Sequence, residues 1–215
     1  MRLRPVKHAS ETIEQHPEHI TLVDRDDKVE LDNVFSSSRP LVVEIGAGKG
    51  QFCHTLAAMN PNLNVLAIEM FDSVIIRALE KQLDDPKENL HLVRMDAQKL
   101  SECLKPGSVD AIYLNFSDPW PKARHEKRRL THPRFLSMYR ELLKPGGTLS
   151  LKTDNRGLFE YSLMTLNQAG VELSDVSLNL HADDPDDNIM TEFEARYGED
   201  GPIYKLIATF KEENA

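Results

Sequence analysis

Four carboxylates lie at or within a few residues of the ends of short apolar runs, and they could bind the hydroxyl and amino groups of a nucleoside. They are Glu44, Glu69, Asp96 and Asp118. Glu44 stands just before the segment Gly-Ala-Gly-Lys-Gly at 46–50, where glycines let the backbone turn tightly and approach a ligand closely. Glu69 could accept hydrogen bonds from both ribose hydroxyls, and Asp96 could accept one from an adenine amino group. These residues predict a site for a nucleotide-like cofactor.

Each of these features also has a purely structural interpretation. The glycines are spaced GxGxG, not GxGxxG as in dinucleotide-binding folds, and they could form only a turn into a helix. Each acid could cap a helix, which suits Asp96 best because a short helix is expected after it. We favour ligand binding because the acids follow three successive apolar runs beside one glycine turn.

The segment 115–122, Asn-Phe-Ser-Asp-Pro-Trp-Pro-Lys, is the most informative part of the sequence. Its two prolines fix the backbone around the only tryptophan, Trp120, which could anchor the loop or stack on a base. A basic segment follows at once, with one acid, Glu126, among six Lys and Arg side chains between Lys122 and Arg134. The whole chain has a net charge of −9, so this segment would either direct a polyanion to one place or form a solvated loop.

The elements that must position these residues alternate between apolar strands and amphipathic helices. We expect strands at 41–45, 65–69, 90–95, 111–114, 148–152, 176–180 and 203–210, and helices at 51–60, 72–83, 97–104, 134–143 and 156–169. This alternation predicts a parallel sheet covered on both faces, with ligands beyond the carboxyl ends of its strands. Residues 1–38 look partly irregular, so we expect an N-terminal extension followed by one domain over residues 39–215.

Two later segments have polar side chains near strand or helix ends. Asp154, in the segment Lys-Thr-Asp-Asn-Arg at 152–156, either caps the next helix or faces a substrate. The segment Thr-Glu-Phe-Glu at 191–194 fits a capping box, with Thr191 as N-cap and Glu194 at the third helical position.

Together these segments resemble the bacterial tRNA (guanine-N(7)-)-methyltransferase family, and the resemblance extends over about residues 40–210. The resemblance implies an α/β, three-layer Rossmann-like class I methyltransferase fold, with a seven-stranded, mostly parallel sheet that has one antiparallel strand. It also implies an enzyme that transfers a methyl group from S-adenosyl-L-methionine to N7 of a guanosine in the tRNA variable loop, position 46 in tRNA numbering.

The resemblance further assigns roles to residues by motif match, with Asp118 as the catalytic residue. The residues that would bind the cofactor are Glu44, Gly46, Gly48, Glu69, Asp96 and Asp118. Those that would bind the substrate are Lys122, Asp154, Thr191, Glu192, Phe193 and Glu194. Those that would contact RNA are Arg124, His125, Glu126, Lys127, Arg128 and Arg129.

Other function classes remain open at this point. A class I methyltransferase for another RNA, a protein or a small molecule is the nearest alternative, and the basic segment favours RNA. A nicotinamide-dependent dehydrogenase disagrees with the GxGxG spacing, and a noncatalytic RNA-binding protein would not need the acids. Cys53 and Cys103 lack a metal-ligand spacing, so we expect no metal. Without a signal pattern or an apolar run of roughly 18 residues, we expect a cytoplasmic protein, monomer or homodimer, with no membrane contact.

Overall fold

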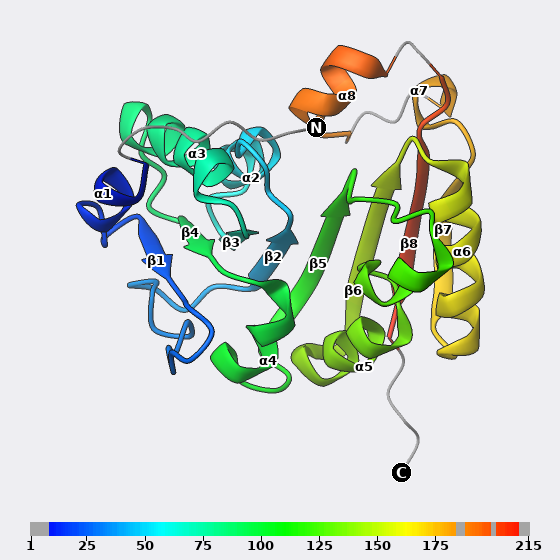
Figure 1. The fold of residues 1–215 in the computed structure, drawn as a ribbon, viewed down its shortest axis with the longest axis horizontal. Helices are drawn as coiled ribbons and strands as arrows, with labels where there is room; N and C mark the ends of the chain where they lie inside the picture. The colour runs from blue at the N-terminus through cyan, green and yellow to red at the C-terminus, as the bar shows by residue number, and fades with distance from the viewer. Residues whose placement is uncertain (1–8, 184–187, 199–200, 211–215) are drawn as a thin grey trace. The chain divides into compact units, whose positions relative to one another are not determined.

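The computed structural model describes residues 9–183, 188–198 and 201–210. The chain divides into two compact units, Met1–Lys105 and Pro106–Ala215. Each unit has its own group of four strands, linked by helices (Figure 1).

The first unit contains four parallel strands in the order β1-β4-β3-β2. The strands are β1 (Ile20–Leu22), β2 (Leu41–Ile45), β3 (Asn64–Glu69) and β4 (Leu90–Arg94). The helices are α1 (Ala9–Glu14), α2 (Gln51–Met59), α3 (Asp72–Asp84), the 3₁₀ turn η1 (Ala97–Lys99) and α4 (Leu100–Cys103). Parallel strands need crossover connections, which α2 and α3 supply here. Since β2, β3 and β4 are paired in parallel, their carboxyl ends meet at one edge of the unit.

The second unit contains the strand order β5-β6-β8-β7, in which β8 runs antiparallel to both neighbours. The strands are β5 (Val109–Asn115), β6 (Leu143–Thr153), β7 (Glu172–Ser177) and β8 (Tyr204–Thr209). The helical segments are the 3₁₀ helix η2 (Ala123–Arg128), α5 (Pro133–Leu142), α6 (Arg156–Gln168), α7 (Leu180–Asp183) and α8 (Glu192–Tyr197). The α/β prediction with one reversed strand is confirmed.

Two details of the predicted elements are wrong. The strand expected at 176–180 is β7 at Glu172–Ser177, because β7 is an exposed edge strand whose register does not follow the apolar residues, and α7 begins at Leu180. The number of strands is eight rather than the seven expected, because β1 pairs in parallel with β4. The Lys99 ammonium group holds the segment after β1 by donating to the carbonyls of Asp24 (2.7 Å) and Asp27 (2.8 Å). Residues 1–8 lie outside the described residues.

His91 links β4 to β1 within the first unit, and it should make the stability of this unit depend on pH. The ring is buried in β4, and its Nε2 lies 2.8 Å from the hydroxyl of Thr21 in β1. Burial, with a smaller effect of the neighbouring His19, lowers the pKa of His91 from 6.5 to about 4. Between these values the unfolded chain binds a proton that the folded chain does not, so stability is lost as the pH falls through this window.

We therefore expect the free energy of unfolding to lose about 3 kcal/mol through His91 as the pH falls from neutral to about 4. The substitution His91→Gln keeps a neutral hydrogen-bonding group and should remove this contribution. Chemical denaturation of both proteins across the pH range measures the difference. Parallel pH profiles for the two proteins would contradict the assignment.

Candidate functional site

The glycine-rich turn between β2 and α2 leaves its backbone open at two positions and packs tightly at the third. Gly46, Gly48 and Gly50 all have positive φ, at 81°, 60° and 81°. A Cβ added at Gly46 or Gly48 would meet no atom within 4 Å, whereas one at Gly50 would lie 2.6 Å from the Cβ of Ala78 in α3. Gly46 and Gly48 therefore give a ligand access to the backbone, and Gly50 allows α2 to pack on α3.

This packing leads to a prediction about stability. Gly50→Ala adds a steric clash to the strain of positive φ, and should cost about 2–5 kcal/mol of unfolding free energy. Gly48→Ala is the matched control, since it has the same unfavourable φ but no clash, and should cost about 1–3 kcal/mol. Thermal unfolding of both variants measures the difference, and equal losses of stability would show that the contact with Ala78 relaxes without cost.

Glu69, at the end of β3, fixes the glycine turn from the neighbouring strand. One carboxylate oxygen accepts hydrogen bonds from the backbone N–H groups of Met70 (2.8 Å) and Phe71 (3.1 Å), and the other accepts from that of Gly48 (3.2 Å). The side chains of Met70 and Phe71 are exposed although they are large and apolar. Sequence reasoning missed both, although their position just after a strand-end acid was the available signal. They give this edge an apolar surface of the kind that a purine base can contact.

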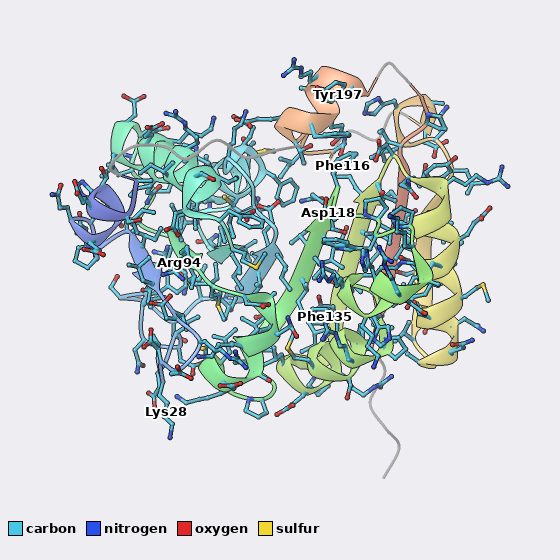
Figure 2. The ribbon with its side chains drawn as sticks, viewed as in Figure 1. Lys28, Arg94, Phe116, Asp118, Phe135 and Tyr197 are labelled. Carbon is cyan, nitrogen blue, oxygen red and sulfur yellow. The ribbon has the colours of Figure 1, made fainter. Side chains whose placement is uncertain are left out.

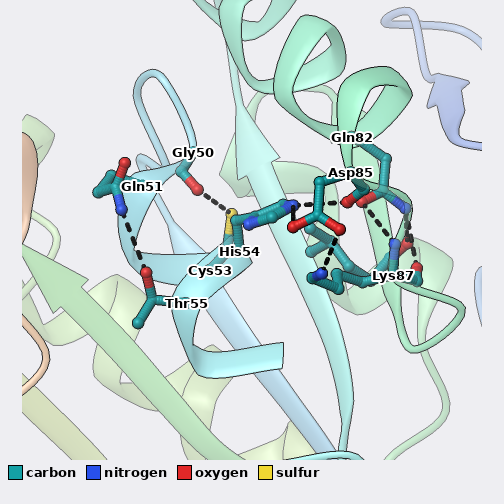
Figure 3. Close-up of polar contacts among 9 residues, drawn as sticks. Gly50, Gln51, Cys53, His54, Thr55, Gln82, Asp85 and Lys87 are labelled. Atoms are coloured by element: carbon teal, nitrogen blue, oxygen red, sulfur yellow. Dashed lines mark hydrogen bonds and ion pairs between the residues drawn. The ribbon is translucent and has the colours of Figure 1, made fainter. Parts of the chain in front are cut away.

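Glu44 and Asp96 flank this position on the neighbouring strands. Glu44 is buried at the end of β2. Burial, and then the nearby Glu44 charge, raises the pKa of the Cys53 thiol well above its usual value. The thiol therefore keeps its proton, which it donates to the carbonyl of Gly50 at 3.3 Å (Figure 3). Asp96 is exposed and caps η1, accepting from the backbone N–H of Gln98 at 3.0 Å.

Helix α2 is held from its other side by the loop after α3. The Nε2 atom of His54 lies 2.8 Å from the carbonyl oxygen of Asp85, and the Lys87 ammonium group contacts the Asp85 carboxylate at 2.6 Å (Figure 3). The structure thus brings three predicted cofactor residues, Glu44, Glu69 and Asp96, to one edge of the first unit. The fourth predicted acid, Asp118, belongs to the second unit.

In the second unit, two carboxylates lie just beyond neighbouring parallel strands. The register pairs Asn115 with Lys152, so Asp118 and Asp154 follow strand ends on the same edge. Both are exposed, and within the described part of the chain neither forms a hydrogen bond or ion pair. Asp154 does not cap the next helix, because the side chain of Asn155 does so by accepting from the N–H of Leu158 at 2.9 Å.

The segment before and around Asp118 is strained. Phe116 and Trp120 have positive φ of 51° and 41°, which costs a residue other than glycine about 1–3 kcal/mol. Their conformation is held by surrounding contacts: the N–H of Phe116 donates to the carbonyl of Lys152 at 2.8 Å, and Arg129 donates to the carbonyl of Trp120 at 3.1 Å. Such strain concentrates at functional sites.

The basic segment divides into an internal and an exposed part. The Arg129 guanidinium is half-buried and lies 4.3 Å from the centre of the Tyr161 ring, so it anchors the Trp120 loop to α6. Arg128 is exposed and covers Trp120 at 4.8 Å. Lys122, Arg124 and Lys127 are also exposed. Trp120 therefore helps to anchor its own loop. The exposed cations, rather than Arg129, are available to bind a polyanion.

A buried ion pair lies between β6 and α8. The Lys152 ammonium group donates to the Glu194 carboxylate at 2.7 Å and to the carbonyl of Ile189 at 2.8 Å. Glu194 also accepts from Asn188 (2.8 Å) and lies 3.0 Å from His181 Nε2. Burial alone would raise the pKa of Glu194, but hydrogen bonds and the charge of Lys152 outweigh it and lower the pKa.

The predicted capping box at the start of α8 is confirmed. Thr191 accepts from the N–H of Glu194 at 3.0 Å, and the Glu194 carboxylate accepts from the N–H of Thr191 at 3.3 Å. Protein groups thus contact both carboxylate oxygens of Glu194. Glu194 is buried, whereas its neighbour Phe193 is exposed at the surface of α8. Sequence reasoning missed Lys152, His181 and Asn188 as its partners, because they are 42, 13 and 6 residues away from it.

Comparison with known proteins gives close relatives. A family model described as "Putative methyltransferase" matches residues 38–206. The chain is 48% identical over 211 residues to a tRNA (guanine-N(7)-)-methyltransferase of Lactiplantibacillus plantarum, covering 98% of this chain and 99% of that protein. It is 46% identical to the protein of the same name from Lysinibacillus sphaericus, covering 98% of both chains.

Solved structures support the same fold at lower sequence identity. The 16S rRNA methyltransferase KamB matches with a TM-score of 0.64 and 16% identity, over 88% of this chain and 98% of that one. A 16S rRNA (adenine(1408)-N(1))-methyltransferase from Catenulisporales acidiphilia, solved with its cosubstrate SAM, matches with a TM-score of 0.60 and 17% identity, over 84% of this chain and 89% of that one.

Two other kinds of site are absent from the described residues. No helix within them is long and apolar enough to cross a membrane. Over the same residues, no group of three His, Cys, Asp or Glu side chains is arranged to hold a metal ion.

Proposed function

We propose that the two units of this chain, which belongs to the tRNA (guanine-N(7)-)-methyltransferase family, bind different molecules. The chain is an enzyme that methylates N7 of a guanosine in tRNA, at position 46 of the variable loop. The observation that carries this conclusion is the identity of 48% over nearly the full length of both chains. In our proposal the first unit binds the methyl donor, and the second unit binds the guanine and the tRNA around it.

The first unit fits a nucleoside-containing donor, S-adenosyl-L-methionine. The open space beside Gly46 and Gly48 lets a ligand approach the backbone. Glu69 would accept hydrogen bonds from the ribose hydroxyls, and Asp96 would accept one from the adenine amino group. Glu44 would place a negative charge next to the glycine-rich turn. When bound, S-adenosyl-L-methionine supplies a methyl group on a positively charged sulfur, which a nucleophile can take without a proton being removed from the donor.

The second unit can recognise guanine through its carboxylates. Position 7 of guanine is a hydrogen-bond acceptor without a proton, so no general base is needed to expose its lone pair. The exposed carboxylates of Asp118 and Asp154 could accept hydrogen bonds from the ring N–H and amino groups of guanine. Adenine lacks this pair of donors, so it would leave carboxylates unpaired. Asp118 would position the base and offset the positive charge that develops on the ring, while alignment supplies most of the rate.

The basic segment would bind the tRNA backbone. The target base must leave its contacts within the tRNA, at a cost of a few kcal/mol, and phosphate contacts by Lys122, Arg124, Lys127 and Arg128 would offset this cost. His125, Glu126 and Arg129 would support this surface, and Thr191, Glu192 and Phe193 would face the substrate. A tRNA substrate supports a cytoplasmic location for the protein, and we propose further that it acts as a monomer or homodimer.

The proposal is tested by incubating the protein with labelled S-adenosyl-L-methionine and an unmodified tRNA transcript, followed by nucleoside analysis. We expect the label in 7-methylguanosine alone. A ribosomal RNA fragment and a mixture of small nucleosides serve as competing substrates, and a binding assay with NAD addresses the dehydrogenase alternative. Label in another nucleoside, or transfer only to the competing substrates, would refute the proposal.

A further inference from the structure

We propose that Phe116 and Phe193 form a stacking surface for the target guanine, and that the buried Lys152–Glu194 pair holds helix α8 so that Phe193 stays against Phe116. This inference rests on the proposed function, because it names how the second unit would grip the base. Phe116 and Phe193 would touch the substrate. Lys152 and Glu194 would be positioning residues that act through α8.

The aromatic side chains form one continuous group in the second unit. The ring centres of Phe116 and Phe193 lie 4.8 Å apart at an interplanar angle of 34°. Those of Phe193 and Tyr197 lie 4.9 Å apart, one helical turn along α8. Figure 2 shows Tyr197, Phe116 and Asp118 following one another from α8 toward the strands. Phe193 is 37% exposed, so the group presents a ring to solvent rather than burying all three in a core.

The backbone of Phe116 indicates that its ring is placed for use. A phenylalanine with φ of 51° is strained, and a glycine at this position would avoid the strain. The strain is maintained where β5 ends, two residues before Asp118. A phenylalanine that served packing alone would be expected to have a relaxed backbone conformation. A ring that must contact a base at the strand end accounts for the strained conformation of Phe116.

The occupant that fits this surface is a guanine base. A flat aromatic ring stacks on any base and does not distinguish among them. The exposed carboxylates of Asp118 and Asp154 follow the same strand edge and could accept hydrogen bonds from a stacked base. An aromatic face on the same strand edge as these two carboxylate acceptors favours a base whose edge offers N–H groups.

Helix α8 has only six residues, so it needs tertiary contacts to hold its place. Its capping carboxylate, Glu194, is fixed by Lys152 from β6, the strand whose residue 152 carbonyl also binds the N–H of Phe116. One residue, Lys152, thus fixes both rings: its backbone holds Phe116, and its side chain holds the helix that carries Phe193. Losing the ammonium group would leave Glu194 buried without its cationic partner.

The test compares substitutions of Phe193 in steady-state methylation of a tRNA transcript. Phe193→Ala should lower kcat/KM for tRNA about 5- to 150-fold, the range expected for loss of one base–aromatic stack. Phe193→Tyr keeps an aromatic face, so it should lose much less kcat/KM than Phe193→Ala. Phe193→Leu fills similar space without an aromatic face, so it should behave like Phe193→Ala. The dissociation constant for S-adenosyl-L-methionine should stay the same in all three. If Phe193→Leu keeps full kcat/KM, the stacking role is overturned.

The positioning role of Lys152 is tested by a double-mutant cycle. Lys152→Met should raise KM for tRNA more than it lowers kcat, and it should have little further effect when Phe193→Ala is already present. Equal effects of Lys152→Met in both backgrounds would overturn the positioning role. Should Lys152→Met fail to fold, Glu194→Gln replaces it in the same cycle. The unchanged protein in each assay must form 7-methylguanosine, so a failure of the proposed function is seen separately.

Discussion

Replacing Asp118 with alanine should lower kcat/KM for tRNA methylation by more than about 100-fold while binding of S-adenosyl-L-methionine largely survives. The loss follows from the proposed role of Asp118, which is to orient the guanine and offset the charge that forms on its ring. Donor binding should persist because the glycine turn, Glu44 and Glu69 belong to the other unit. Steady-state kinetics and calorimetric titration of the donor measure the two effects.

The fold should tolerate this change, because the Asp118 side chain is exposed and forms no hydrogen bond or ion pair within the described residues. Asp110→Ala is a matched control: it removes the same charge from the same unit, in a surface pair with Lys144 at 2.7 Å. Surface pairs of this kind contribute about 0–1 kcal/mol, so the control should keep its activity. Near-normal turnover by Asp118→Ala would show that the assigned role is wrong.

Replacing Arg124 and Lys127 together with alanine should weaken tRNA binding and flatten its dependence on salt. Each phosphate contact contributes about 0.7–0.9 to the slope of log K against log salt concentration, so two contacts should reduce the magnitude of the slope by about 1.4–1.8. Both side chains are exposed, which makes a loss of stability unexpected. Filter binding of tRNA at several salt concentrations measures the slope.

Arg129→Ala provides the contrast. Arg129 donates to the carbonyls of Pro119 and Trp120 and covers Tyr161, so its removal should lower the melting temperature and disturb the Trp120 loop. Its effect on the salt slope should be smaller than that of the exposed pair. An unchanged salt slope after loss of Arg124 and Lys127 would remove these two side chains from the RNA interface.

Much of the first unit could be predicted because its signals are local. The buried parallel strands are continuous apolar runs, and the glycines and acids that follow them stand within a few residues of the strand ends. The same reasoning failed at β1, a strand of three residues that is too short to show a period. It also misplaced β7, because an edge strand with mostly exposed side chains has no apolar pattern to fix its register.

The second unit depends more on contacts between residues distant in sequence. The pattern at 191–194 predicted the capping box, because such a box is local, but it could not show that Lys152 neutralises Glu194 from 42 residues away. Nor could composition show that Arg129 turns inward whereas Arg124 and Lys127 stay exposed. The strained backbone of Phe116 had no sequence signal, because phenylalanine rarely adopts positive φ.

N7 of one guanosine in tRNA is the atom to which the enzyme should deliver the methyl group. The most direct measurement uses a tRNA transcript in which the variable-loop guanosine is replaced by 7-deazaguanosine, whose ring carries a C–H group where guanine has N7. The carboxylates proposed to hold the base would meet an unchanged Watson–Crick edge, so this tRNA should bind with normal affinity. Our account predicts that it accepts no methyl group while the matched guanosine transcript is methylated. Continued methylation of the substituted transcript would contradict the account.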